Sequence, residues 1–448
     1  MTQNGAEDDY GGALAGASIL VIDDEPGMRN FLSKILGARV KRVVEAASPA
    51  EATARLDETH FDLVILDNIM PGKTGLDWVV EQRRLGFFAD AILITAYADL
   101  DTAIKALRAG VSDFVLKPFR ANQILNAVAR TLDRQNLRRD NMLLRHELAS
   151  DVARGQLLGA SPALARVRQM LARLAPLPTP VLFTGASGTG KEIAARALHQ
   201  ASERADKPFV AVNCAAIAPD RIAEELFGLI EGEDQRRAGL FLLAEGGTLF
   251  LDEVAQMPEA LQAALLRVLE DRRIRPIGGE RDIPLNLRFC FATNADLRQA
   301  VAENRFRADL FHRLNVVNVE MPPLRDRSED IVELAAHFMS QLSQSLGMPA
   351  LDLDEETLVK MRRYDWPGNV RELRNLVERS VILGGFPEEF SGSSGVTGTK
   401  AVENLELVTK RHILHVLDRC EGNRAEAARR LGVSRKTIDR RFAEWGMG

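Results

Sequence analysis

Acidic, hydroxyl and basic residues follow short apolar runs in the N-terminal part of the sequence. Asp23 and Asp24 follow the first run, Asp67 follows the third, Thr95 ends the fourth, and Lys117 comes directly after the fifth. If these runs are parallel strands of one sheet, their carboxyl ends meet at one edge and bring the five side chains together. Three carboxylates at one point repel unless a hard cation lies among them, and Mg²⁺ prefers oxygen ligands.

This cluster suits phosphoryl chemistry. A carboxylate can attack a phosphoryl group, and a lysine and a hydroxyl can then stabilise the phosphoryl oxygens. For one aspartate alone, a solvated strand end or a helix N-cap would be the simpler interpretation. Matches at four strand ends favour a phosphoacceptor site instead.

The apolar runs themselves are predicted to be buried strands, because each is short and lies between amphipathic or turn-like segments. The predicted strands are Ser18–Ile22, Val43–Ala46, Phe61–Leu66, Ala91–Ile94 and Phe114–Leu116. Five such β/α units form a flavodoxin-like, doubly wound sheet, with function at the carboxyl ends of its strands.

A second cluster begins with a glycine-rich loop after the predicted strand Val181–Thr184. Glycines let backbone N–H groups surround phosphates, and Lys191 at the end of the loop would reach the β- and γ-oxygens. Further along, an apolar strand ends in Asp252 and Glu253, which directs one carboxylate toward Mg²⁺ and the other toward an attacking water. An Asp-Glu pair alone could be an ordinary strand end, but the two motifs together predict an ATP-hydrolysing α/β domain. The predicted nucleotide-binding residues of the loop are Gly185, Ser187, Gly188, Thr189, Gly190, Lys191 and Glu192, with Glu192 in place of the usual Ser or Thr.

The C-terminal segment has helix-turn-helix spacing. A short predicted helix, Ala425–Leu431, is followed by a Gly-Val-Ser turn and a second helix, Arg435–Trp445. Between Lys410 and Glu444 there are ten Lys or Arg against five Asp or Glu, a basic patch that suits DNA. Candidates for phosphate or base contacts are Arg435, Lys436, Thr437, Arg440 and Arg441, although a surface arginine on a helix is often only solvated.

Composition narrows the class of protein. The 448 residues imply several domains, and the net charge of −5 gives no overall sign of nucleic-acid binding. Cys214, Cys290 and Cys420 are isolated, which favours a reducing compartment over a disulfide framework. No apolar run approaches the roughly 20 residues that span a bilayer, and the acidic N-terminus is unlike a signal peptide. We therefore expect a cytoplasmic protein without a membrane partner.

A long charged helix is predicted from about residue 121 to 149. Its apolar positions are Ile124, Val128, Leu132, Leu137, Leu144 and Leu148. They suggest a connector and a dimer seam, with a solvated linker helix as the alternative. Ser391–Lys400 has small, flexible residues, which is typical of a linker.

The N-terminal motifs resemble the receiver domain of bacterial two-component systems. The resemblance implies that Asp67 is phosphorylated, that Asp23 and Asp24 help to hold Mg²⁺, and that Thr95 and Phe114 occupy the switch positions. Lys117 completes the set, and Met-Pro-Gly at 70–72 also matches. A sensor histidine kinase would then be the partner that supplies the phosphoryl group.

The central segment resembles the AAA+ domain of the NtrC family of sigma-54 activators, in which the lysine of the loop is indeed followed by Glu. The resemblance assigns Asn213 to restraining the catalytic glutamate and Thr293-Asn294 to sensor I. It assigns Arg307 and Arg313 to arginine fingers that reach a neighbouring subunit, and Arg371 to sensor II. It implies ATP and Mg²⁺ as cofactors, with Asp252 as a metal ligand, and a homodimer that forms a higher-order ring. The C-terminal segment resembles the family's Fis-type domain.

The predicted organisation of the α/β multidomain chain follows from these segments. A disordered N-terminus (1–16) precedes the receiver (17–130), a helical linker (131–156), the AAA+ core (157–325), its helical lid (326–385), a flexible linker (386–402) and an all-α helix-turn-helix domain (403–448).

One departure from the family is plain in the sequence. NtrC-family activators carry GAFTGA in a loop that contacts sigma-54, between the motifs ELFG and GGTLFLDE. Here the 17 residues LIEGEDQRRAGLFLLAE occupy that interval, without GAFTGA and in a shorter loop, a pattern that resembles NtrX-like regulators.

Three functions stay open at this point. The first is a phosphorylation-controlled transcription regulator with an ATPase ring, which contacts a DNA operator and an RNA polymerase holoenzyme, although sigma-54 activation in the usual way is not expected. The second is a repressor or housekeeping-polymerase regulator whose AAA+ domain serves only assembly. The third is a remodeller of another protein, against which the helix-turn-helix counts.

Overall fold

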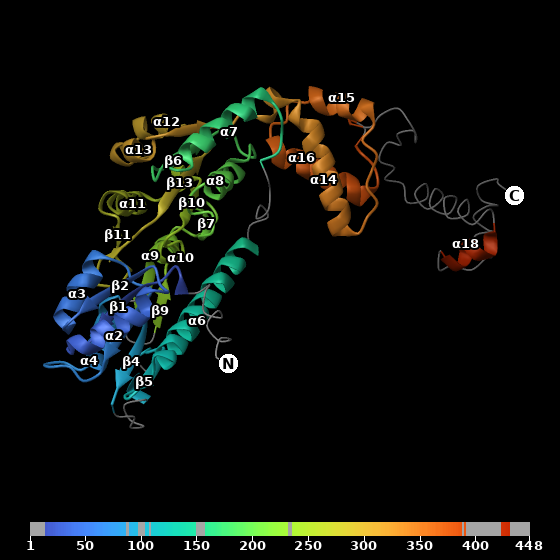
Figure 1. Ribbon diagram of the computed structural model, residues 1–448. Coiled ribbons are helices and arrows are strands. Elements are labelled where there is room, and N and C mark those ends of the chain that lie inside the picture. The colour runs from blue at the N-terminus through green and yellow to red at the C-terminus, as the bar shows by residue number, and fades with distance from the viewer. Residues whose placement is uncertain are drawn as a thin grey trace. The chain divides into compact units, whose positions relative to one another are not determined.

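The computed structural model describes residues 14–86, 89–96, 104–106, 109–148, 157–231, 235–387, 389–390 and 423–430. These fall into two compact units, one within 1–351 and 361–382 and the other within 352–360 and 383–448. The first unit contains two five-stranded sheets (Figure 1). In the described ranges, no helix is both long and apolar enough to cross a membrane.

The first sheet has the strand order β2-β1-β3-β4-β5, and all neighbouring strands are parallel. This order confirms the predicted doubly wound fold. Each predicted strand overlaps an observed one, although the third begins two residues later than expected. The strands are β1 (Ser18–Ile22), β2 (Arg42–Ala46), β3 (Leu63–Asp67), β4 (Asp90–Thr95) and β5 (Asp113–Leu116).

Alternate residues of these strands pack into two separate cores, because successive strand side chains point to opposite faces. Ile19 and Val21 pack with α2 (Pro26–Gly37) and α6 (Ala121–Leu148). Leu20 and Ile22 pack with α3 (Pro49–Glu58) and α4 (Gly75–Leu85). The β-strand ends are thereby held between two helical layers.

The long helix α6 is continuous, as predicted, but its proposed seam needs correction. Ile124, Val128 and Leu132 are buried against the receiver sheet, so they are not available to a dimer partner. Leu137 is 69% exposed and stays available. The side chains of Leu144 and Leu148 lie outside the described residues. The apolar repeat therefore covers a sheet in the first half of the helix.

The second sheet has the order β14-β6-β13-β10-β7 and is also parallel throughout. Its central strands are almost fully apolar because helices cover both faces. The strands are β6 (Val181–Thr184), β7 (Phe209–Asn213), β10 (Thr248–Asp252), β13 (Arg288–Thr293) and β14 (Asn318–Glu320).

One face of this sheet is covered by α7 (Pro162–Leu174) and α8 (Lys191–Gln200). The other face packs on a larger set of elements. That set includes α9 (Ile222–Phe227), α10 (Leu240–Leu243), η1 (Val254–Gln256), α11 (Glu259–Asp271), α12 (Leu297–Ala302) and α13 (Ala308–Leu314). Two antiparallel pairs complete the domain: β8 (Gly228–Glu231) with β9 (Gln235–Ala238), and β11 (Arg273–Ile274) with β12 (Ile283–Pro284).

Helices continue after the second sheet. They are η2 (Leu324–Arg327), α14 (Asp330–Leu346), α15 (Glu355–Arg363) and α16 (Asn369–Leu383). In the second unit, α18 (Arg424–Arg430) covers most of the first predicted helix of the helix-turn-helix, and Asn423 Oδ1 caps it by accepting from Glu426 N–H. The predicted linker Ser391–Lys400, the second helix and the five DNA-contact candidates lie outside the described residues.

Candidate phosphoacceptor and nucleotide sites

The receiver site forms where β1, β3 and β5 end. Lys117 Nζ lies 2.9 Å from Asp67 Oδ2 and 3.5 Å from Asp23 Oδ2. Asp23 and Asp67 are almost fully buried, whereas Asp24 is exposed. The predicted convergence of strand ends is therefore what the fold produces, although the role of each residue stays a prediction.

The residues present fit a divalent cation. Oxygen atoms of Asp23, Asp24 and Asp67 lie within 4.8 Å of one another. Among the described residues, the buried Asp67 Oδ1 has no hydrogen-bond partner. Burial is the largest influence on Asp23 and raises the pKa of its carboxyl, while the Glu25 N–H and Lys117 oppose that shift. A cation among these oxygens would satisfy the unpartnered atom and offset the crowding of negative charge.

The two predicted switch residues have different surroundings. Thr95 is buried at the end of β4, and its carbonyl accepts a hydrogen bond from Lys117 N–H at 2.8 Å. Phe114 on β5 is 45% exposed. A buried threonine at the end of β4 and an exposed ring on the adjacent strand β5 are compatible with the two positions that the family resemblance assigns.

The phosphate-binding loop connects β6 to α8. Gly185, Gly188 and Gly190 have φ of 142°, 76° and 98°, a region that glycine enters without the Cβ penalty. Lys191 begins α8, is buried, and donates from Nζ to Gly185 O at 2.9 Å and to Ala186 O. Burial lowers the pKa of Lys191, while Asp252 and Glu253 oppose that shift. A buried ammonium group that contacts carbonyls of its own loop would be strongly stabilised by a bound phosphate group.

Two other loop residues already have partners. Thr189 Oγ1 donates to Ala186 O at 2.9 Å. The Glu192 carboxylate accepts from Arg196, and the Arg196 guanidinium lies over the Phe209 ring. Glu192 is therefore tied to its own helix, and its predicted contact with nucleotide stays a prediction.

Asp252 and Glu253 lie at the end of β10. Glu253 has a left-handed backbone with φ of 53°, and its carboxylate accepts a hydrogen bond from Asn294 N–H at 3.4 Å. Burial, followed by the charge of Asp252, raises the pKa of Glu253. A raised pKa makes this carboxylate a better proton acceptor, which is the property required of the residue that activates water.

The predicted sensor residues surround this pair. Asn213 pairs with Asp252 in the β7–β10 register, but its Oδ1 accepts from Ala215 N–H. Among the described residues no hydrogen bond joins Asn213 to Glu253, so its restraining role stays a prediction. Thr293 is buried at the end of β13, and Asn294 follows it.

The three predicted arginines differ in their contacts. Arg371 Nη1 donates to Ser187 Oγ at 2.9 Å, which places the predicted sensor II residue directly on the phosphate loop. Arg307 pairs with Asp309 of its own helix, at 2.8 Å, and its side chain is 39% exposed. Arg313 is exposed and donates to Leu269 O. The last two are thus accessible on the α13 side of the domain, as residues acting on a neighbouring subunit must be.

Two buried residues that contact the phosphate loop were not predicted from the sequence. Asn369 and Arg327 contact the backbone of the phosphate loop from α16 and η2. The Pro-Gly turn before Asn369 was an available signal for an unusual backbone there, but nothing in the spacing indicated its partner.

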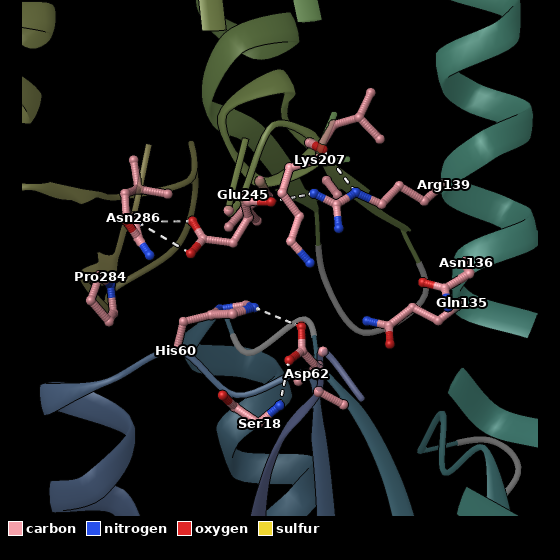
Figure 2. Close-up of a pocket in the computed structure, with 18 of the residues that line it drawn as sticks. Ser18, His60, Asp62, Gln135, Asn136, Arg139, Lys207, Glu245, Pro284 and Asn286 are labelled. Carbon is pink, nitrogen blue, oxygen red and sulfur yellow. Dashed lines mark hydrogen bonds and ion pairs between the residues drawn. The ribbon is translucent and has the colours of Figure 1, made fainter. Parts of the chain in front are cut away.

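A cleft of about 1230 Å³ also occurs in the first unit (Figure 2). The lining residues that Figure 2 labels are Ser18, His60, Asp62, Gln135, Asn136, Arg139, Lys207, Glu245, Pro284 and Asn286. Arg139 donates to Leu243 O at 3.0 Å and to Glu245 O, and Asp62 accepts from Ser18 N–H. None of the described residues predicted to do chemistry lines this cleft, so the chemistry belongs to the two strand-end clusters.

A receiver fold with an acidic strand-end cluster, followed by a P-loop core with a helical lid, defines a response regulator that carries an AAA+ domain. Family models match in the same order. They are the response regulator receiver domain (19–129), the sigma-54 interaction domain (157–320), the AAA+ ATPase lid domain (325–388) and the Fis family of bacterial regulatory proteins (404–445).

Full-length relatives agree with this order. The chain is 38% identical to the regulatory protein AtoC of Escherichia coli, over 96% of this chain and 98% of AtoC. It is 36% identical to the response regulator PilR of Pseudomonas aeruginosa, over 96% and 98%. The crystal structure of NtrX from Brucella abortus in complex with ADP is similar with a TM-score of 0.51 and 34% identity, covering 96% of this chain and all of that chain.

The chain therefore belongs to the NtrC family of response regulators, with receiver, sigma-54 interaction AAA+ and Fis-type helix-turn-helix domains. The predicted fold classes are confirmed. The match to the sigma-54 interaction domain does not support the expectation that sigma-54 is not activated in the usual way.

Proposed function

We propose that the protein is a phosphorylation-controlled, DNA-binding transcription regulator of a two-component system, with an AAA+ domain that binds and hydrolyses ATP and assembles into a ring. The observation that carries this proposal is the presence of two intact strand-end sites in one chain. Asp67 faces Lys117 in the receiver, and the buried Lys191 faces the charges of Asp252 and Glu253 in the ATPase.

In the receiver, Asp67 is the nucleophile that accepts a phosphoryl group from a sensor histidine kinase. Bound Mg²⁺, held by Asp23, Asp24 and Asp67, would neutralise charge on the transferring group. Lys117, which already pairs with Asp67, would move its ammonium onto a phosphoryl oxygen. The buried Thr95 hydroxyl supplies a further donor beside the site.

In the ATPase, the loop and Lys191 would hold the phosphates, Asp252 would be a ligand of Mg²⁺, and Glu253 would accept a proton from the attacking water. The NtrX structures from Brucella abortus in complex with ATP and with ADP support nucleotide binding by this fold. Arg307 and Arg313 would complete the site of a neighbouring subunit, so turnover would depend on ring assembly.

We further propose that hydrolysis is not transmitted to sigma-54 by an exposed loop in the usual way. The interval that carries GAFTGA in the family contains the β8–β9 hairpin here. Ile230 N–H donates to Ile277 O at 2.9 Å, Ile277 N–H donates to Gly228 O at 3.0 Å, and Ile230 is buried. Strand β8 is thus tied to the domain, and the sequence EGEDQRR from Glu231 to Arg237 is highly charged. Burying such charges against a partner costs several kcal/mol unless each is paired.

Transcription in vitro with each polymerase holoenzyme tests this output. On a sigma-54 promoter with upstream operator sites, phosphorylated protein and ATP should give no hydrolysis-dependent, heparin-resistant open complexes. On a promoter read by the housekeeping sigma factor, activation or repression should persist with a non-hydrolysable ATP analogue and with the Glu253→Gln variant. Open complexes on the sigma-54 promoter that disappear with the analogue would show that the shortened loop still drives sigma-54.

Binding of DNA by the C-terminal domain is expected to depend on salt concentration. Because the segment Lys410–Glu444 carries five more basic than acidic residues, the logarithm of its affinity for an operator should fall linearly with the logarithm of salt concentration. A chain that ends at Gly385 should keep its ATPase activity and lose operator binding in a gel-shift assay. Two copies should bind an inverted repeat, because a closed dimer imposes two-fold symmetry on the half-sites. Operator specificity in the shortened chain would assign recognition to another domain.

A further inference from the structure

The outer side of the phosphate-binding loop is covered by η2 and α16. Three consecutive loop carbonyls accept hydrogen bonds from these two elements. Asn369 Nδ2 donates to Ser187 O at 2.9 Å, Val370 N–H donates to Gly188 O at 3.0 Å, and Arg327 Nη2 donates to Thr189 O at 2.8 Å. Together with the contact of Arg371 on Ser187 Oγ, the lid touches three successive residues of the loop.

These contacts lie in a tightly packed region between the phosphate loop and the lid. Asn369 is 2% exposed and Arg327 is 3% exposed. A Cβ atom at Gly188 would lie 2.3 Å from Gly368 O and 3.1 Å from Arg371 Cβ, so the loop and the lid meet without space for a side chain. The first residue of α16 also joins η2 to the loop, because Asn369 Oδ1 accepts from Leu324 N–H at 2.8 Å.

The orientation of a carbonyl determines that of the following amide. A trans peptide is planar, so its C=O and the N–H of the next residue point in opposite directions. Holding the carbonyls of Ser187, Gly188 and Thr189 toward the lid therefore turns the N–H groups of Gly188, Thr189 and Gly190 toward the other side of the loop. Backbone N–H groups on that inner side are what a glycine-rich loop offers to phosphate.

We infer that Asn369 and Arg327 are positioning residues for nucleotide phosphates, which act by holding the carbonyls of the phosphate loop from the lid. They need not touch nucleotide themselves. The inference rests on the proposed function of the loop in binding ATP and adds to it a direct dependence of phosphate affinity on the docking of η2 and the start of α16. Any movement of the lid would release the carbonyls and misalign the amides.

The decisive variant is Asn369→Asp in the full-length protein. Aspartate has the same size and tolerates the φ of 52° at this position, and it keeps an oxygen that accepts from Leu324 N–H. It cannot donate to Ser187 O, and it places a negative oxygen against that carbonyl. We expect the affinity for Mg-ADP, measured by isothermal titration calorimetry, to fall about tenfold or more, since one buried hydrogen bond is lost and a negative charge faces the carbonyl.

Two further measurements separate positioning from simple loss of structure. Asn375→Asp, an exposed position on the same helix, is the matched control and should bind Mg-ADP like the wild-type protein. Arg327→Lys should keep more affinity than Arg327→Gln, because the lysine ammonium comes close to the reach of the arginine and can donate to Thr189 O, whereas the shorter glutamine amide cannot reach it. The increase in unfolding temperature that ADP produces should be smaller in Asn369→Asp than in Asn375→Asp.

The outcomes distinguish this inference from the proposed function. If the wild-type protein fails to bind Mg-ADP, the ATPase assignment is wrong and the inference falls with it. If the wild-type protein binds, and both Asn369→Asp and Arg327→Gln bind with the same affinity, only the inference is overturned. If Asn369→Asp fails to fold, the comparison of Arg327→Gln with Arg327→Lys decides, and equal affinities in that pair contradict the inference.

Discussion

Replacement of Asp67 by asparagine is expected to abolish labelling of the protein by radioactive acetyl phosphate in the presence of Mg²⁺. The amide has the same size, but it lacks the negative oxygen that attacks phosphorus and that binds the cation. The Asp67 carboxylate is 2.9 Å from Lys117 Nζ and has a buried oxygen without a hydrogen-bond partner among the described residues, so the attacking group is both oriented and poorly solvated.

A matched control is the exposed Asp133→Asn on α6, which should be labelled like the wild-type protein. The label should be released by hydroxylamine, because an acyl phosphate reacts with that nucleophile while a phosphoserine does not. Labelling of Asp67→Asn at the strength of the wild-type protein would place the phosphoacceptor elsewhere. Removal of Mg²⁺ with a chelator should lower the labelling of the wild-type protein to the level of the variant.

The added charge should also change assembly. A phosphoryl group carries about −1.5 to −2 charges and replaces the single charge of the Asp67 carboxylate, so a site with two further carboxylates and one lysine becomes more negative. Such a change typically biases an element with two arrangements, and the exposed Phe114 and the buried Thr95 lie on the strands next to the site. Light scattering before and after phosphorylation would therefore report a different average mass, and Asp67→Asn should show no change.

The receiver site was predictable because it depends on strand ends. Short apolar runs mark buried parallel strands, and a doubly wound sheet brings their carboxyl ends to one edge whatever the helices between them contain. Asp23, Asp67 and Lys117 therefore come together as expected, although their positions span almost a hundred residues. The same logic placed Asp252 and Glu253 opposite the phosphate loop.

The lid contacts could not be predicted in this way. Asn369 and Ser187 are 182 residues apart, and their contact depends on how η2 and α16 dock, which no local pattern encodes. In the first half of α6, a local pattern was present but did not identify the partner of the helix. Its apolar repeat at Ile124, Val128 and Leu132 was compatible with a partner helix and with a sheet face, because both require the same spacing, and only the fold distinguishes them.

The ATPase site is expected to be shared between two neighbouring subunits. Lys191→Ala should lose nucleotide binding, and Arg307→Ala should bind ATP but lose turnover by about a thousandfold or more, as expected for a missing arginine finger. The Arg307 guanidinium is partly exposed and pairs only with Asp309 of its own helix among the described residues, so it is free to exchange that partner for a phosphate of the next subunit. Each variant alone should be nearly inactive in a steady-state phosphate-release assay.

Mixing the two variants should restore activity. In a ring assembled at random from equal amounts, about a quarter of the interfaces combine an intact loop from one subunit with an intact arginine from the other. Mixing Lys191→Ala with Glu253→Gln is the matched control, because both changes damage the same side of the interface and no complete site can form. Wild-type activity per chain should likewise rise with protein concentration as rings assemble. Activity that is unchanged on dilution to monomers, or a mixture no more active than its separate components, would show that Arg307 does not act on a neighbouring subunit.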